Sequence, residues 1–142
     1  MKAMLVPVDG LPITIEVEGL GGLQAAVGGY IEPCSWIFDD KPAVYVNEEG
    51  KLACEPNRAV YATAEDARNL SALGGNVEEG CVLDILYGDF VCVGFDPNTG
   101  ESRDISDNEI AKVKERFGTL QSVESGWIES LRIRLARRAK RR

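Results

Sequence analysis

The side chains that most often carry out catalysis are missing or dispersed in this sequence. Its 142 residues contain no histidine. That absence excludes Ser–His and Cys–His nucleophile pairs, zinc sites of the H-E-x-x-H type and any imidazole general base. Catalysis would have to rely on carboxylates, lysine, tyrosine or a thiolate. The sequence therefore favours a protein that is not an enzyme, and we predict no catalytic residue, no metal site and no cofactor.

A glycine-rich stretch, GLGGLQAAVGG at residues 19–29, has the composition of a phosphate-binding loop. The dinucleotide-binding fingerprint, however, needs a third glycine where Gln24 stands, and a Walker A loop needs a lysine that this stretch lacks. We therefore interpret the stretch as a short helix that Gly28–Gly29 ends. Such a helix would bury Leu23 and Val27 against a sheet.

Acidic residues occur as adjacent pairs in segments whose sequences are typical of turns. A glycosidase needs two carboxyl groups held roughly 5–10 Å apart across a cleft, and a hard cation needs several converging oxygens. Nothing in the spacing of the pairs establishes either arrangement, so we interpret them as solvated loop charge. The pairs are Asp39–Asp40, Glu48–Glu49 and Glu78–Glu79.

A polar segment, CEPNRAVYATA at residues 54–64, holds the best candidates for ligand binding. Arg58 can bind a carboxylate or a phosphate, with Asn57 and Tyr61 close by in the chain. The sequence also contains 23 acidic side chains, and an arginine in such surroundings more often forms an ion pair with one of them. We favour the ion pair. A small-ligand pocket or a carboxylate-based hydrolase around the three residues stays as an alternative.

The sequence contains no evident signal that would target the protein out of the cytoplasm. No apolar run approaches the ~18 residues of a membrane span, and MKAMLVPVDG is too short an apolar start for a signal peptide. We therefore expect a cytoplasmic protein whose four cysteines are reduced thiols, with a zinc site as the weaker alternative.

The charge is divided unevenly along the chain. The last eleven residues carry seven basic side chains and no acidic one, a net charge of +7, whereas residues 1–131 carry nine basic and 23 acidic side chains, a net charge of −14. Apolar residues recur every three or four positions after Gly118, which predicts an amphipathic basic helix. Its candidate contact residues are Trp127, Leu131, Arg132, Arg134, Leu135, Arg137, Arg138, Arg141 and Arg142.

Three kinds of partner suit this C-terminal segment. Its apolar stripe can pack on a protein partner or on a second copy of the chain, with the arginines meeting the acidic body. Its arginines can instead bind nucleic-acid phosphates, or the helix can lie on an anionic membrane surface without spanning it. We rank protein partner or homodimer first, nucleic acid second and membrane third.

The remaining pattern predicts an α+β domain over residues 1–117, followed by the C-terminal helix over 118–142. We expect a mostly antiparallel sheet of about five to seven strands with two or three short helices. Strands are expected at 1–8, 13–18, 30–38, 43–46, 82–87, 90–95 and 101–104. Helices are expected around 23–27, over 63–73 and from a Ser106 cap to Phe117, the last with Glu109 completing a capping box.

Four motifs resemble a known family in their order and spacing. They are LQAAVGGYIE (23–32), VNEEGKL (46–52), Pro56–Asn57 and GDFVCVG (88–94). Over roughly residues 1–117 the chain resembles domain of unknown function 3846, small proteins of bacteriophages, plasmids and other bacterial mobile elements. The resemblance implies no particular site residue. It implies an accessory protein of a mobile element in a bacterial cytoplasm that counters or modulates host defences. From the missing histidine and the amphipathic C-terminal segment we expect it to act by binding a protein partner.

Overall fold

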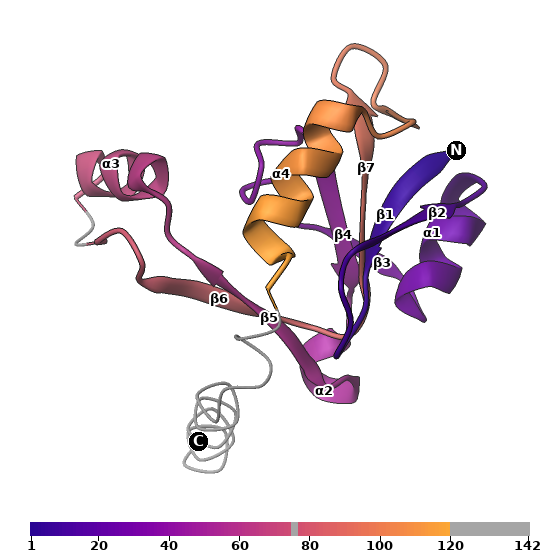
Figure 1. Ribbon diagram of the computed structural model, residues 1–142, viewed down its shortest axis with the longest axis horizontal. Coiled ribbons are helices and arrows are strands. Elements are labelled where there is room, and N and C mark those ends of the chain that lie inside the picture. The colour runs from indigo at the N-terminus through magenta and orange to yellow at the C-terminus, as the bar shows by residue number, and fades with distance from the viewer. Residues whose placement is uncertain (75–76, 120–142) are drawn as a thin grey trace.

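The computed structural model describes residues 1–74 and 77–119 and shows an α+β fold. Figure 1 shows a body built on a sheet and an arm that leaves it. In chain order the described elements are β1 (Lys2–Val6), β2 (Ile13–Glu16), α1 (Gly19–Val27), β3 (Ile31–Pro33), β4 (Ala43–Asn47), α2 (Gly50–Ala53), β5 (Pro56–Tyr61), α3 (Ala64–Ala72), β6 (Val82–Tyr87), β7 (Phe90–Asp96), β8 (Glu101–Arg103) and α4 (Asp107–Phe117).

The body is an antiparallel sheet in the order β2-β1-β7-β4-β3, with β8 paired to the end of β7. Strand β7 lies at the centre, where Cys92 faces Met4 of β1 on one side and Val44 of β4 on the other. Its residues Phe90–Val93 are fully buried. A continuous apolar run is typical of a strand covered on both faces, and α1 and α4 contact the sheet.

The glycine-rich stretch forms the packing helix that the sequence predicts. Helix α1 starts at Gly19, somewhat earlier than expected, and buries Leu23 and Val27 against the sheet. Gly28 ends it in the left-handed conformation, with φ of 77°, and donates its N–H to the carbonyl of Gln24. A residue with a β-carbon would be strained at this φ, so the glycine has a structural role there.

Helix α4 also begins as predicted. The Ser106 hydroxyl accepts from the Glu109 N–H, and the Glu109 carboxylate accepts from the Ser106 N–H, which completes the capping box. The helix buries Val113 and Phe117 in the main core, where the Phe117 ring meets Phe90 edge to face at 5.1 Å. Its apolar face thereby covers the sheet next to β1.

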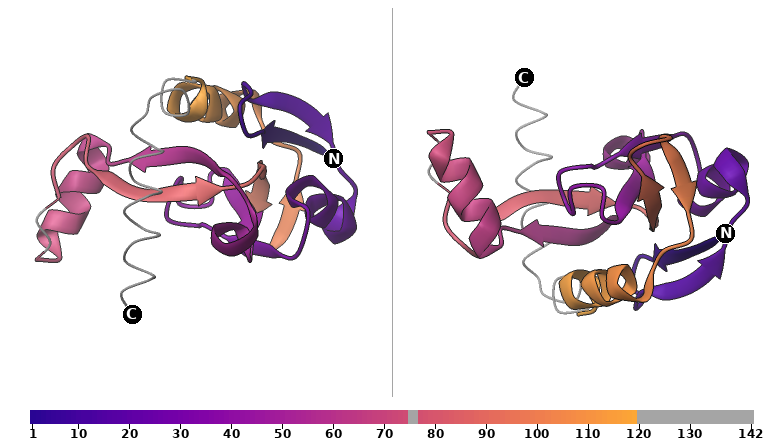
Figure 2. Two further views of the ribbon diagram at one scale, coloured as in Figure 1. Left: turned by 90° about the horizontal axis from the view of Figure 1, so that it is seen from below. Right: turned by 90° about the horizontal axis from the view of Figure 1, so that it is seen from above.

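The arm consists of β5, β6 and α3, and it extends away from the sheet in Figures 1 and 2. β5 and β6 form a separate two-stranded antiparallel sheet. Strands β6 and β7 are joined by Gly88–Asp89 but belong to different sheets, because Gly88 at φ of 77° redirects the chain. α3 lies at the outer end of the arm.

Several elements differ from the sequence prediction. The described residues form eight strands, because β5 was not foreseen. β3 and β8 have only three residues each and are shorter than expected. The expected strand 30–38 ends at Pro33 and continues as turns, in which Asp39 and Asp40 adopt positive φ. Residues 50–53 are a short helix. The predicted C-terminal helix from residue 120 lies outside the described residues.

Candidate functional site

Two open grooves lie where the arm meets the body, and Trp36 lines both of them. The arm groove, of about 1140 Å³, runs between residues 36–41, α3 and α4. The acidic groove, of about 360 Å³, lies between β3, the β4–α2 turn and β6. Trp36 is 46% exposed, so it offers an aromatic face to anything that enters either groove.

Arg116 of α4 fixes the inner wall of the arm groove. Its guanidinium donates to the carbonyls of Ile37 at 2.6 Å and Tyr61 at 3.1 Å, and to the Asp66 carboxylate at 3.0 Å. It also lies 5.6 Å from the centre of the Phe38 ring. One side chain therefore joins α4, the 36–41 segment, the end of β5 and the start of α3.

The arm groove carries mixed charge. Around its exposed aromatic residues are four basic and five acidic side chains, and Tyr61 is 40% exposed beside them. A surface that alternates charge around aromatic anchors suits a protein partner, because nucleic-acid sites are predominantly basic. The basic residues are Lys41, Arg68, Lys112 and Arg116, and the acidic ones are Asp39, Glu65, Asp66, Glu79 and Glu115.

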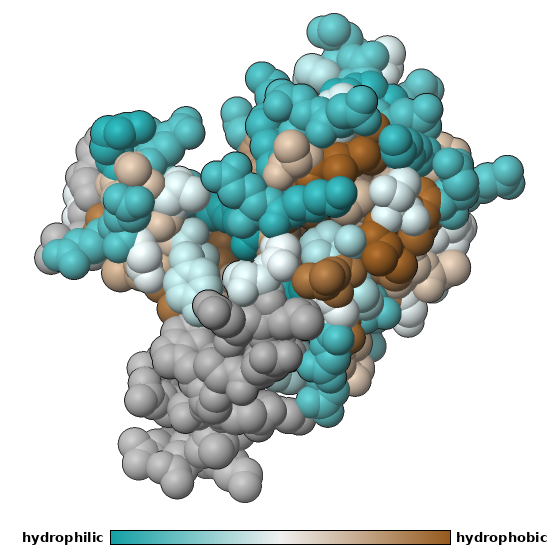
Figure 3. Space-filling model, in the orientation of Figure 1, coloured by the Kyte–Doolittle hydropathy of each residue, from teal (hydrophilic) through white to brown (hydrophobic). Residues whose placement is uncertain are grey.

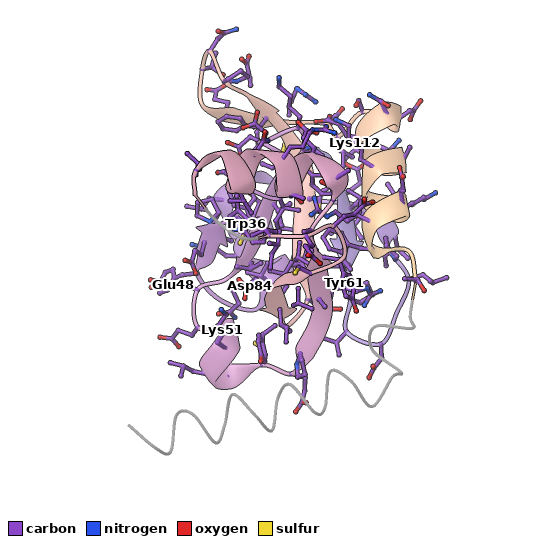
Figure 4. All side chains as sticks on the ribbon, turned by 90° about the vertical axis from the view of Figure 1, so that its left-hand side faces the viewer. Trp36, Glu48, Lys51, Tyr61, Asp84 and Lys112 are labelled. Carbon is purple, nitrogen blue, oxygen red and sulfur yellow. The ribbon has the colours of Figure 1, made fainter. Side chains whose placement is uncertain are left out.

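The acidic groove is strongly negative. Its lining holds four carboxylates and one ammonium, that of Lys51, which pairs with Asp84 at 3.0 Å. Figure 4 shows Trp36, Glu48, Lys51 and Asp84 on one side of the molecule. The unbalanced charge of −3 favours a cationic occupant.

Cys34 is the one thiol in the lining of the acidic groove. Burial, together with the nearby carboxylates of Glu32 and Asp84, raises the pKa of Cys34 to about 11 against a smaller lowering by Lys51. The thiolate is the nucleophilic form of cysteine. Cys34 is therefore protonated at neutral pH and has the character of a packing residue.

The structure separates the three predicted ligand-binding residues. Asn57 and Arg58 are buried in β5, whereas Tyr61 lies at the arm groove. The Asn57 amide donates to the carbonyls of Val6 and Gly88, both at 2.8 Å. These bonds tie β5 to β1 and to the β6–β7 turn, so the Asn57 side chain is occupied by structural contacts.

Arg58 is 1% exposed, and its guanidinium donates to backbone and amide oxygens. Its Nε donates to the Phe117 carbonyl at 3.1 Å, its Nη1 to Asn57 Oδ1 at 2.7 Å, and its Nη2 to the Gly10 carbonyl. These acceptors are uncharged, so the ion pair with an acidic side chain that the sequence favoured is not among the contacts of Arg58 in the described residues. Burial lowers the pKa of Arg58, and Asp9 partly offsets this effect.

The hydrogen-bond donors of its guanidinium are the reason why Arg58 resembled a ligand contact in the sequence. A guanidinium has five donors and suits carboxylate or phosphate oxygens, but here it serves the carbonyls at the end of α4 and at the β1–β2 turn. A cation is favourable at a helix C-terminus. The residue thus joins the arm to the body from inside.

Trp36 and Leu52 are exposed groove residues that sequence reasoning missed. Leu52 is 91% exposed on α2. The available signal was Leu52 in the polar segment NEEGKL, where it has no obvious core to join. Trp36 gave no such signal, because it stood in a segment expected to be a strand. The space-filling view shows hydrophilic side chains over α3 and α4 and an apolar patch beside the β1–β2 hairpin, where Leu11 and Ile13 are exposed (Figure 3).

Three further expectations concern the whole chain. The C-terminal contact residues from Trp127 to Arg142 lie outside the described residues. Within residues 1–74 and 77–119, no group of three or more Cys, Asp or Glu side chains is placed to hold a metal ion. No helix among those residues has the length and apolar character to cross a membrane.

The fold and the two grooves define a small α+β protein with an extended two-stranded arm. The family model described as "Domain of unknown function (DUF3846)" matches residues 1–118. The chain therefore belongs to this family, as the motifs in the sequence indicated. Comparison with curated proteins and with solved structures gives no match.

Proposed function

We propose that this chain is a non-enzymatic protein-binding module that takes a protein partner in the arm groove. The observation that carries the proposal is the half-exposed Trp36 at the junction of two open grooves. Tryptophan and tyrosine supply much of the binding energy at protein interfaces. Of the aromatic residues that line the arm groove, Trp36 and Tyr61 are the exposed ones, and Phe38 is half-buried.

The size and charge of the arm groove support a macromolecular partner. Small-molecule sites are enclosed clefts of ~300–1,000 Å³ with predominantly apolar walls. The arm groove is open at about 1140 Å³ and lined by nine charged side chains. A helix or an extended segment of another protein fits such a surface better than a metabolite.

The non-enzymatic part of the proposal rests on residue chemistry. The chain has no histidine, and the groove thiol Cys34 has a pKa of about 11. The donors of Asn57 and Arg58 serve internal oxygens. These facts favour partner binding over catalysis as the function of the grooves.

The family resemblance supplies the proposed context. The resemblance implies a setting in phages, plasmids and other mobile elements, so we propose an accessory role in the bacterial cytoplasm in which partner binding modulates host defence. The C-terminal segment supports a further partner, a second copy of the chain, because its basic charge complements the acidic body.

A photoreactive amino acid placed in the arm groove tests this proposal. Ala64 is an exposed α3 residue in the groove lining, and Ala25 is an exposed α1 residue in neither groove. In bacterial cells, position 64 should crosslink a discrete protein that position 25 does not capture. Identical products from both positions would contradict the arm groove as the binding site.

Nucleic-acid association is the second candidate, and the seven basic residues of the last eleven favour it. The body would oppose it, since residues 1–131 have a net charge of −14. This candidate predicts salt-sensitive binding to DNA or RNA that disappears when the last eleven residues are removed. The absence of binding at low salt would dispose of it.

A further inference from the structure

We infer that the acidic groove is the receptor for the arginine-rich C-terminal segment of a second copy of this chain. The inference rests on the proposed self-association and names the surface that would receive the segment. It starts from the groove itself, which is open, 360 Å³ in volume and lined by Glu32, Glu48, Glu49 and Asp84.

The carboxylates of this groove greatly exceed its cations. Lys51 is already paired with Asp84, so three carboxylates in the lining have no cation of the groove to balance them. Glu32, Glu48 and Glu49 are all exposed. Carboxylates form paired hydrogen bonds with guanidinium groups, which makes arginine the best-matched partner side chain.

The groove also has the apolar surface that an arginine-rich helix needs. Trp36 offers its ring face at one end and Leu52 lies 91% exposed at α2. A guanidinium stacks on an indole face, and the methylene stem of arginine covers apolar surface. A purely acidic loop would lack both of these features.

The chain itself supplies an occupant of matching chemistry. Residues 132–142 carry seven basic side chains and no acidic one, and the apolar stripe expected from the sequence includes Trp127 and Leu131 before this range and Leu135 within it. In the proposed complex the arginines of the segment pair with the groove carboxylates, and its leucines pack on Trp36 and Leu52. Exchange of this segment between two copies gives a closed symmetric dimer in which each groove is filled once.

Light scattering of the full-length chain tests the inference. At low ionic strength we expect the mass of a dimer, and at ~1 M salt the mass should halve as the charges are screened. Glu48→Lys with Glu49→Lys should give the monomer mass at low salt. The matched control, Glu18→Lys with Glu101→Lys, changes the charge equally at exposed positions outside both grooves and should remain dimeric.

Charge reversal gives the complementary result. Arg137→Glu with Arg138→Glu should also abolish the dimer, and combining this pair with Glu48→Lys and Glu49→Lys should restore at least half of the dimer mass fraction. In a Trp127→Phe chain Trp36 is the sole tryptophan, and its emission should change with salt in parallel with the mass.

The outcomes distinguish the assignment of the acidic groove as the receptor from self-association itself. A dimer that persists with Glu48→Lys and Glu49→Lys would overturn the groove assignment and leave self-association standing. A wild-type monomer whose Trp36 emission ignores salt would overturn both. A monomer whose Trp36 emission responds to salt would assign the groove to the same chain's segment and overturn the second copy as occupant.

Discussion

At the scale of single residues, the most informative side chain is Arg58. It lies in the interior of a protein with a strongly acidic composition, yet the oxygens to which it donates are uncharged. A buried donor set of this kind stabilises the native state chiefly because its loss leaves several acceptors without partners. Arg58 is therefore a structural residue that holds β5 against α4 and the β1–β2 turn.

Replacement of Arg58 by methionine should strongly destabilise the protein. The change leaves the oxygens of Gly10, Asn57 and Phe117 without this donor, and we expect the free energy of unfolding to fall by about 3–5 kcal/mol. Urea denaturation measures it. Arg68→Met, at an exposed position of α3, should change stability by less than ~0.5 kcal/mol. Equal effects of the two substitutions would contradict the structural role.

Glu109 gives the protein an acid-sensitive contact. Burial raises the pKa of Glu109, but hydrogen bonds from Arg103 and Ser106 outweigh this effect, so its pKa lies below the usual value. A depressed carboxyl pKa stabilises the fold above the unfolded pKa of ~4.3, and that contribution is lost as the pH falls through the lower folded pKa.

Glu109→Gln should therefore destabilise the protein at neutral pH and much less in acid. The difference in unfolding free energy between wild type and variant should be largest near pH ~6 and should shrink towards pH ~2, as Glu109 takes up a proton and becomes uncharged like glutamine. Urea denaturation at the two pH values checks it. A difference that is independent of pH would show that the charge of Glu109 contributes little.

At the scale of elements, the orientation of the arm depends on the contacts of Arg116. The ion pair with Asp66 has little exposed surface, with side-chain exposures of 14% and 22%, so solvent screens it less than a surface pair. The two residues lie on α4 and α3, elements that come from the body and from the arm. Their contact closes the inner end of the arm groove.

Arg116→Gln should loosen the arm without unfolding the body. We expect amide hydrogen exchange in α3 to become faster while exchange in α1 stays unchanged, because local opening follows the loss of local contacts. Asp66→Asn should have a smaller effect, because Arg116 keeps its bonds to the Ile37 and Tyr61 carbonyls, and the double variant should add little to Arg116→Gln, since the ion pair is already lost. Unchanged exchange in α3 would contradict this role of Arg116.

The elements with regular patterns were predictable from the sequence, and those that depend on the tertiary structure were not. ITIE alternates, Ser106 and Glu109 form a local capping box, and Gly28 needs a left-handed conformation, so each could be inferred from a few residues. β5 was missed because Asn57 and Arg58 interrupt its apolar pattern, and their partners lie far away in the chain. For the same reason the grooves could not be foreseen, since Trp36 becomes a groove residue only when the arm meets the body.

At the scale of the whole molecule, the two grooves are expected to bind different partners. The arm groove carries mixed charge and is proposed to bind an outside protein, and the acidic groove is proposed to bind the basic C-terminal segment of a second copy. The two share Trp36, so occupation of one groove should affect the other. This arrangement would let self-association influence partner binding.

Affinity capture with a blocked arm groove tests the central claim most directly. Ala64→Trp places a large side chain in the arm groove, and Ala25→Trp places the same side chain on an exposed helix position outside both grooves. Each full-length variant is expressed in the bacterial host, and the proteins bound to it are quantified by mass spectrometry. We predict a partner that wild type and Ala25→Trp retain equally and that Ala64→Trp loses at least tenfold. Equal retention by all three chains would contradict binding in the arm groove.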